Sequence, residues 1–158
     1  MDIKVSTAQN IFVEIVHEVY PLIETKFNEL YRAADWQENA KLYDSVQELE
    51  REFNSLAYYE KKLVFPALMD KINDEQKTPV NQNPEEILRL VSLKEQRIYL
   101  LADYTKNLSE TTDINKKHPI FELINLFDGA FKNVKDKWQV FLKKLSTQKT
   151  CPAHLKST

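Results

Sequence analysis

The feature that most restricts the fold of this chain is its lack of glycine. Gly129 is the only glycine in 158 residues. Tight hairpin turns and phosphate-binding loops both need several glycines, since glycine adopts positive φ freely and lets a backbone approach a ligand closely. The sequence therefore argues against hairpin-rich sheets and nucleotide-binding loops, and it leaves long helices with few connections as the main building element.

Four segments place apolar residues three and four positions apart, as one buried helix face requires. The first helix is predicted to begin at about Ser6 or Thr7, either of which can cap it, and to end at about Ala34. Pro21 is expected to kink it. Its predicted inward positions are Phe12, Ile15, Val16, Val19, Leu22, Ile23, Phe27 and Leu30.

The second helix is predicted to follow a break at residues 35–38 and to run to about Ile72. Pro66 lies inside this apolar pattern, and proline removes one backbone donor, so the last turns are expected to bend or break there. Its predicted inward positions are Leu42, Val46, Leu49, Phe53, Leu56, Leu63, Val64 and Ala67.

The third and fourth helices are predicted to start at two residue pairs that end in proline. Asn83 can cap a helix that begins at Pro84, and His118 precedes Pro119 in the same way. The third helix has the predicted inward positions Ile87, Val91, Lys94, Ile98, Leu101, Thr105 and Leu108. The fourth has Ile120, Ile124, Phe127, Phe131, Val134, Trp138, Phe141 and Leu145.

Four long helices joined by short connections predict one domain over residues 1–146. The predicted fold class is all-α, an up-and-down bundle of four antiparallel helices. Residues 147–158 show no apolar period, so they are predicted to form a disordered C-terminal tail.

The charge pattern and the cysteine content limit the kinds of partner and the cellular compartment that can be expected for this chain. The 22 Lys and Arg nearly balance the 24 Asp and Glu, and both signs are mixed along the chain, which argues against nucleic acid or an anionic membrane as a partner. Cys151 has no second cysteine for an intrachain disulfide. No apolar run reaches the roughly 18 residues of a membrane span. A cytoplasmic protein is the resulting expectation.

Residues 56–68, with the sequence LAYYEKKLVFPAL, resemble the second-helix signature of the hemerythrin-like family of HHE cation-binding bundles. In that signature an inward His is followed four residues later by an inward Glu and then by a hydrophobic ending that contains proline. Phe65, Pro66 and Leu68 match this ending. With four helices of suitable length, the resemblance extends over about residues 8–146. It implies a non-haem di-iron site with roles in oxygen binding, iron or redox sensing, or repair of nitrosative damage.

Most positions that would hold metal ligands carry other residues. Two divalent ions need imidazole and carboxylate groups from all four helices. On the second helix the His position is Leu56, whereas the Glu position keeps Glu60. The corresponding positions on the fourth helix are Val134 and Trp138, which are predicted to face the bundle axis at the same level. On the third helix the position is Lys94, whose ammonium repels a divalent cation. The residues therefore predict no di-iron site.

The histidines are not expected to replace the missing metal ligands. His17 lies near the expected ligand position of the first helix, but a rotation of about 100° per residue places it away from Phe12 and turns Val16 inward. His17 is therefore predicted to be a surface residue, with a ligand role as the alternative. His118, at a helix start, and His154, in the tail, are not expected to bind metal.

Glu60 and Lys94 are the two charged residues predicted inside the bundle. A carboxylate that faces a core must be paired, hydrogen-bonded or protonated. Lys94, on the following helix, is its expected partner in a buried ion pair. The alternative is that Glu60 lies close enough to a bundle end to reach water, while Lys94 buries only its stem and extends its ammonium outward.

Two functional hypotheses follow, from different classes. The first is a metal-free hemerythrin-like bundle without a cofactor, which acts as a binding or regulatory module for an unknown protein partner or as a homodimer. The second is a metalloprotein with an incomplete iron site, built on His17 and Glu60, that takes part in oxygen, iron or redox sensing. No nucleophile and base or carboxylate pair recurs at matching helical spacing, so an enzyme is not predicted.

Overall fold

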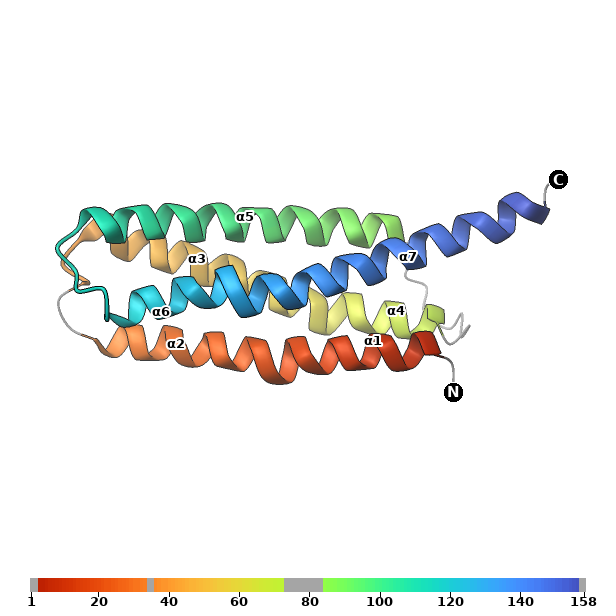
Figure 1. Ribbon diagram of the computed structural model, residues 1–158, viewed down its shortest axis with the longest axis horizontal. Coiled ribbons are helices and arrows are strands. Elements are labelled where there is room, and N and C mark those ends of the chain that lie inside the picture. The colour runs from red at the N-terminus through yellow and green to blue at the C-terminus, as the bar shows by residue number, and fades with distance from the viewer. Residues whose placement is uncertain (1–2, 34–35, 73–83, 157–158) are drawn as a thin grey trace.

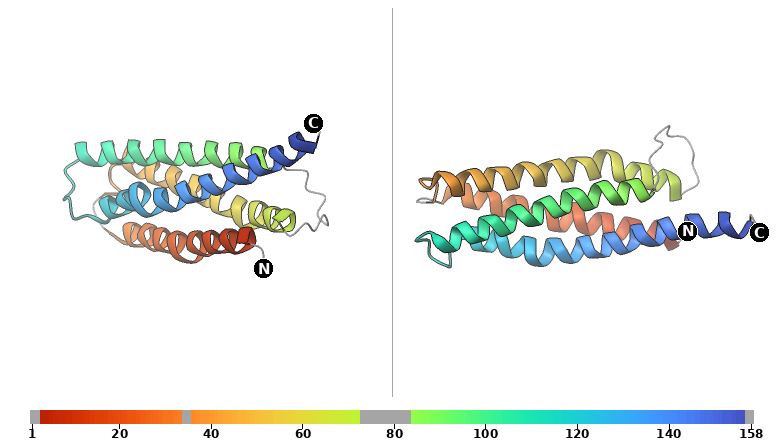
Figure 2. Two further views of the ribbon diagram at one scale, coloured as in Figure 1. Left: turned by 45° about the vertical axis from the view of Figure 1, so that its right-hand side comes forward. Right: turned by 90° about the horizontal axis from the view of Figure 1, so that it is seen from above.

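The computed structural model describes residues 3–33, 36–72 and 84–156, and these form four long helices that pack side by side (Figures 1 and 2). No strand occurs in these ranges. The elements are α1 (Ile3–Val13), the π-helical turn η1 (Glu14–Val19), α2 (Tyr20–Arg32), α3 (Ala40–Tyr59), the π-helical turn η2 (Glu60–Val64), α4 (Phe65–Ile72), α5 (Pro84–Thr111), α6 (Pro119–Leu126), the π-helical turn η3 (Phe127–Phe131) and α7 (Lys132–Lys156). The predicted all-α class and the four helices are confirmed.

The core is mainly apolar and draws on all four long helices. Its centre is aromatic: the Phe53 ring lies 5.1 Å from Tyr20, 6.1 Å from Phe27 and 5.9 Å from Phe127, measured between ring centres. All four of these side chains are buried. The edge-to-face contacts of Phe53 with Tyr20 and Phe127 add to the stabilisation that burial of the rings provides. None of the helices in the described residues has the length and apolar character needed to cross a bilayer.

The helix ends differ most from the predicted boundaries at the start of α1 and at the end of α7. α1 begins at Ile3, ahead of the expected caps, while α3 begins after Asn39, whose side chain accepts a hydrogen bond from the Leu42 N–H at 3.1 Å. α5 begins at Pro84 as predicted, but the expected Asn83 cap lies outside the described residues. α7 continues to Lys156, beyond the other helices (Figure 1), where an irregular tail was predicted.

A π-helical turn precedes the proline of the first long helix. In an α-helix Pro21 would collide with the His17 carbonyl and leave it without a donor. The helix widens there instead: η1 ends just before α2, and the Tyr20 N–H bonds to the Ile15 carbonyl, five residues back. The added residue rotates the chain that follows, so Tyr20 is fully buried whereas Leu22, predicted to face inward, is 44% exposed. The expected kink is therefore a π-helical turn.

The second long helix accommodates Pro66 in the same way, with a π-helical turn before the proline. The helix does not break there, because η2 widens the backbone around the Lys62 carbonyl that the proline ring would strike. The Phe65 N–H bonds to the Glu60 carbonyl, again five residues back. The third π-helical turn, η3, contains Gly129. The long helices thus stay continuous through both prolines.

On α5, three buried residues lie one position after the residues that the sequence pattern predicted to face inward. The buried positions are Ile87, Val91, Glu95, Ile98, Ala102, Thr105 and Ser109. Lys94, Leu101 and Leu108 were predicted inward but are only partly buried. The small side chains of Ala102 and Ser109 let α5 approach its neighbours, and the two leucines cover the flanks of the contact. At positions 101/102 and 108/109, the larger apolar residue therefore lies on the flank of the contact and the smaller residue lies in the core.

Candidate functional site

Four polar side chains, one from each long helix, meet inside the bundle: Tyr20, Glu60, Glu95 and Lys135. Three of them are fully buried, and Glu95 is 4% exposed. We refer to these four residues as the core cluster. Removal of a charge from water is unfavourable unless the charge is paired, so a buried group of this kind is uncommon. The core cluster is therefore the candidate functional site.

The π-helical turns lie beside the core cluster in the chain. Tyr20 directly follows η1, and Glu60 is the first residue of η2. Lys135 lies on α7, one helical turn beyond the end of η3 at Phe131. Such turns occur often at functional sites because they change the direction in which side chains point. Here they bring polar residues of three helices onto the core face.

Glu60 is the centre of the core cluster. The Lys135 ammonium donates to both carboxylate oxygens, with Nζ 2.5 Å from Oε1 and 2.5 Å from Oε2. The Tyr20 hydroxyl donates to the same Oε1. Lys135 Nζ also lies 5.2 Å from the ring centre of Tyr20 and 5.6 Å from that of Phe131, within the range of a cation–π interaction. One cation and one hydroxyl thus compensate the buried carboxylate.

Glu95 is less well satisfied than Glu60. Its Oε2 lies 3.7 Å from Lys135 Nζ and accepts no hydrogen bond from the described residues. Its Oε1 accepts a hydrogen bond from Gln139 Nε2 at 3.2 Å, and Gln139 Oε1 accepts one from the Ser92 hydroxyl at 3.1 Å. Burial raises the pKa of Glu95 to about 7, even though the Lys135 charge opposes that shift. A carboxyl that titrates near neutral pH is frequent at functional sites.

The charge of the core cluster depends on these protonation states. Burial, reinforced by Glu60, raises the pKa of Tyr20 well above its ordinary value of 10.0, so its hydroxyl keeps its proton at neutral pH. When Glu95 is protonated, the Glu60 carboxylate and the Lys135 ammonium balance each other. When Glu95 ionises, the cluster has one net negative charge. Ionisation of Glu95 as the pH rises through about 7 therefore adds one negative charge to the buried site.

Glu95 makes a predictable contribution to the pH dependence of stability. Between its ordinary pKa of 4.5 and its folded value of about 7, the folded chain holds a proton that the unfolded chain has released. The stabilisation is therefore fully present below about pH 4.5 and is lost as the pH rises through about 7. A shift of this size corresponds to about 3 kcal/mol.

The measurement is urea unfolding of the native protein and of Glu95→Gln from about pH 4 to about pH 8. We expect the stability of the variant relative to the native protein to increase by about 3 kcal/mol across this range. Because all other titrating groups are shared, their effects cancel in the difference. Parallel stability curves would contradict the raised pKa.

The core cluster can compensate charge and bind a proton, but none of its groups faces solvent. General acid–base or nucleophilic catalysis needs a side chain within hydrogen-bond reach of a substrate. Here the helices would have to separate first. The Lys135 ammonium, with its three donors, instead lies between two carboxylates as a bound cation would.

The expected pair of Glu60 and Lys94 is not formed. Lys94 is partly exposed at the side of α5, and its ammonium donates to the Ser55 hydroxyl at 3.2 Å. Glu95 takes the inward position on that helix, and the cation on Glu60 is Lys135 from the fourth helix. Of the two possibilities that the sequence left open for Lys94, the outward one is correct. For Glu60 neither applies, because it is buried and paired with a different lysine.

The other predicted positions agree with the sequence more closely. Val134 and Trp138 are buried, as predicted. His17 is exposed on η1, as predicted. His118 caps α6, where its Nδ1 accepts a hydrogen bond from the backbone two residues on at 3.2 Å. The side chain of His154 lies outside the described residues.

No known protein family, curated protein or solved structure matches this chain. The hemerythrin-like resemblance therefore rests on residues 56–68 and on the arrangement of four helices. In the described ranges, no group of three or more His, Cys, Asp or Glu side chains is arranged to hold a metal ion.

Sequence reasoning missed three of the four residues in the core cluster, although two carried a signal. Lys135 lies four residues after Phe131 and three before Trp138, a spacing that places it on the core face. Glu95 lies between apolar positions of α5 in the same way. Tyr20 could not be found from a regular period, because η1 inserts a residue just before it.

Proposed function

We propose that this protein is a metal-free, up-and-down bundle of hemerythrin-like type that acts as a non-catalytic binding or regulatory module for a protein partner or a second copy of itself. One observation carries the proposal. The Lys135 ammonium lies 2.5 Å from both oxygens of Glu60 and 3.7 Å from the nearer oxygen of Glu95. Metal-binding bundles hold cations between side chains of facing helices, and here the ammonium takes the place of the metal.

The residues of the core cluster do not suit a divalent ion. Carboxylates and a tyrosine are competent oxygen ligands, but the Lys135 ammonium already occupies the space between Glu60 and Glu95. A divalent ion there would have to displace or deprotonate the lysine, and it would find no imidazole from His17, which is exposed. The donor set therefore argues for an internal cation instead of a bound one.

The metal content of natively purified protein tests this proposal. We expect iron, manganese and zinc each to be far below one equivalent per chain by mass spectrometry, with no change in His17→Ala. Iron bound stoichiometrically, and lost in both Glu60→Gln and His17→Ala, would instead favour the second hypothesis, an incomplete iron site in oxygen, iron or redox sensing.

A further inference from the structure

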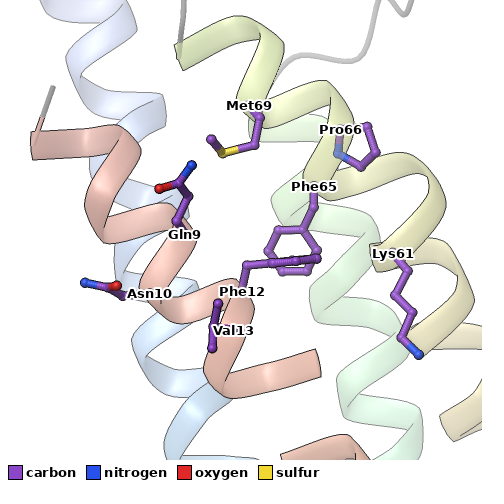
Figure 3. A pocket seen from close by; sticks show the side chains of 8 residues that line it. All are labelled: Gln9, Asn10, Phe12, Val13, Lys61, Phe65, Pro66 and Met69. Atoms are coloured by element: carbon purple, nitrogen blue, oxygen red, sulfur yellow. The ribbon is translucent and has the colours of Figure 1, made fainter. Parts of the chain in front are cut away.

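A groove of about 550 Å³ lies between α1 and α4, at the end of the bundle where both termini are found (Figures 1 and 3). Its volume falls within the usual range for small-molecule sites. It is lined by Gln9, Asn10, Phe12, Val13, Lys61, Phe65, Pro66 and Met69. The core cluster contributes none of these residues, so the groove is a separate feature of the molecule.

The groove has an apolar body and one cationic end. Phe12 and Phe65 meet edge to face across its middle, with ring centres 4.2 Å apart. Figure 3 shows Met69 at one end, beside Gln9, and Lys61 at the other. An apolar surface with a few polar groups at its rim is the usual composition of a ligand site. The groove is therefore polarised along its length.

Charge complementarity identifies the kind of molecule that fits. Lys61 is the only charged residue in the lining, and its exposed ammonium forms no ion pair or hydrogen bond with another described residue. The remaining polar groups of the lining are the two amides, Gln9 and Asn10. An anionic head can therefore pair with Lys61 while an apolar chain covers Phe12 and Phe65 and ends near Met69.

We infer that the groove binds an amphipathic monoanion, a medium-chain carboxylate whose head pairs with Lys61 and whose chain lies over the phenylalanines. This inference goes beyond the proposed function, because it assigns a small-molecule ligand to the bundle in addition to a protein partner or a second copy. It does not depend on the metal-free core. Iron in the core would refute the proposed absence of metal and leave the binding measured at the groove unchanged.

Calorimetric titration of the full chain with decanoate tests the inference. We expect one site per chain, and binding of decanol, which has the same chain length but no charge, about three- to fivefold weaker, as loss of one exposed ion pair implies. Lys61→Glu should weaken decanoate binding by at least about fivefold, because it replaces attraction by repulsion. Lys62→Glu is the matched control, because Lys62 is adjacent and exposed but lies outside the groove. The affinity of this variant for decanoate should differ from that of the native chain by less than about twofold.

The apolar end is tested by Met69→Glu, which should weaken binding at least about tenfold by placing a charge beside the alkyl chain. Its thermal unfolding is recorded in parallel, and Lys61→Glu, at an exposed position, keeps the test valid if Met69→Glu does not fold. Equal losses in the Lys61 and Lys62 variants, equal binding of decanol and decanoate, or no binding to the native chain would each overturn the inference. A dimer that Val13→Glu dissociates would also overturn it, since a second copy would then cover the groove.

Discussion

Replacing Lys135 by methionine is expected to lower the free energy of unfolding by about 3 to 5 kcal/mol, the usual effect of removing one partner from a buried ion pair. The reason is that the variant leaves the Glu60 carboxylate in the core with only the Tyr20 hydroxyl to stabilise its charge. Glu95 loses its nearest cation as well. Urea unfolding at neutral pH measures the effect.

Two further variants show whether the loss comes from the stranded charge. Glu60→Leu combined with Lys135→Met removes both charges together, so its stability should lie within about 2 kcal/mol of the native protein or exceed it. Lys94→Met is the matched single control, because Lys94 is partly exposed and its ammonium, which donates to the Ser55 hydroxyl and lies 5.6 Å from the ring centre of Tyr59, pairs with no carboxylate among the described residues. It should change stability by less than about 1 kcal/mol. Equal losses for the two lysines would contradict the assignment of Lys135 as the internal cation.

Trp138→Ala is expected to lower the free energy of unfolding by about 3 to 5 kcal/mol, the range for truncation of a buried large aromatic. Trp138 is fully buried, with its ring centre 4.9 Å from that of Phe65 and 5.7 Å from that of Phe141. The variant would leave a cavity between α4 and α7 that rigid neighbouring helices can fill only in part. Chemical denaturation and thermal melting both report the change.

Two controls separate packing from other effects at this position. Trp138→Phe should cost less than about 2 kcal/mol, because the Nε1 atom has no hydrogen-bond partner among the described residues and most of the ring volume is kept. Val140→Ala, on the same helix but 52% exposed, should change stability by less than about 0.5 kcal/mol. A loss below about 1 kcal/mol for Trp138→Ala would show that this residue is not packed in the core.

The helices could be predicted from the sequence because each one presents a nearly continuous apolar face, and because proline or a polar break marks most of their starts. The faces themselves were predictable to within one residue. Ile15, Ile23, Phe27 and Leu30 are buried as expected, whereas Leu22 is not. A regular period carries no information about an inserted residue, so the rotation after η1 could not be read from spacing alone.

The core cluster was harder to predict, for an electrostatic reason. Glu60 is buried as its position on the second helix indicated, but a sequence shows which residues are charged and not which of them share a buried environment. Lys94 was the predicted partner because it occupies a metal-ligand position on the helix that follows Glu60, whereas the ammonium that binds Glu60 is that of Lys135 on the fourth helix. The choice depended on the rotation of α5, where one position separates a side chain on the flank from Glu95 in the core.

The prolines that follow η1 and η2 have a consequence for how long each helix must be. Each of these turns accommodates one residue more than an α-helix of equal height, so Pro21 and Pro66 each come with an insertion that keeps the core face aligned on both sides. A chain that built the same bundle without these prolines would need one residue fewer in each of the two helices. If a residue were deleted without replacing the proline, or the proline replaced without deleting a residue, the apolar positions after the turn would no longer face the core.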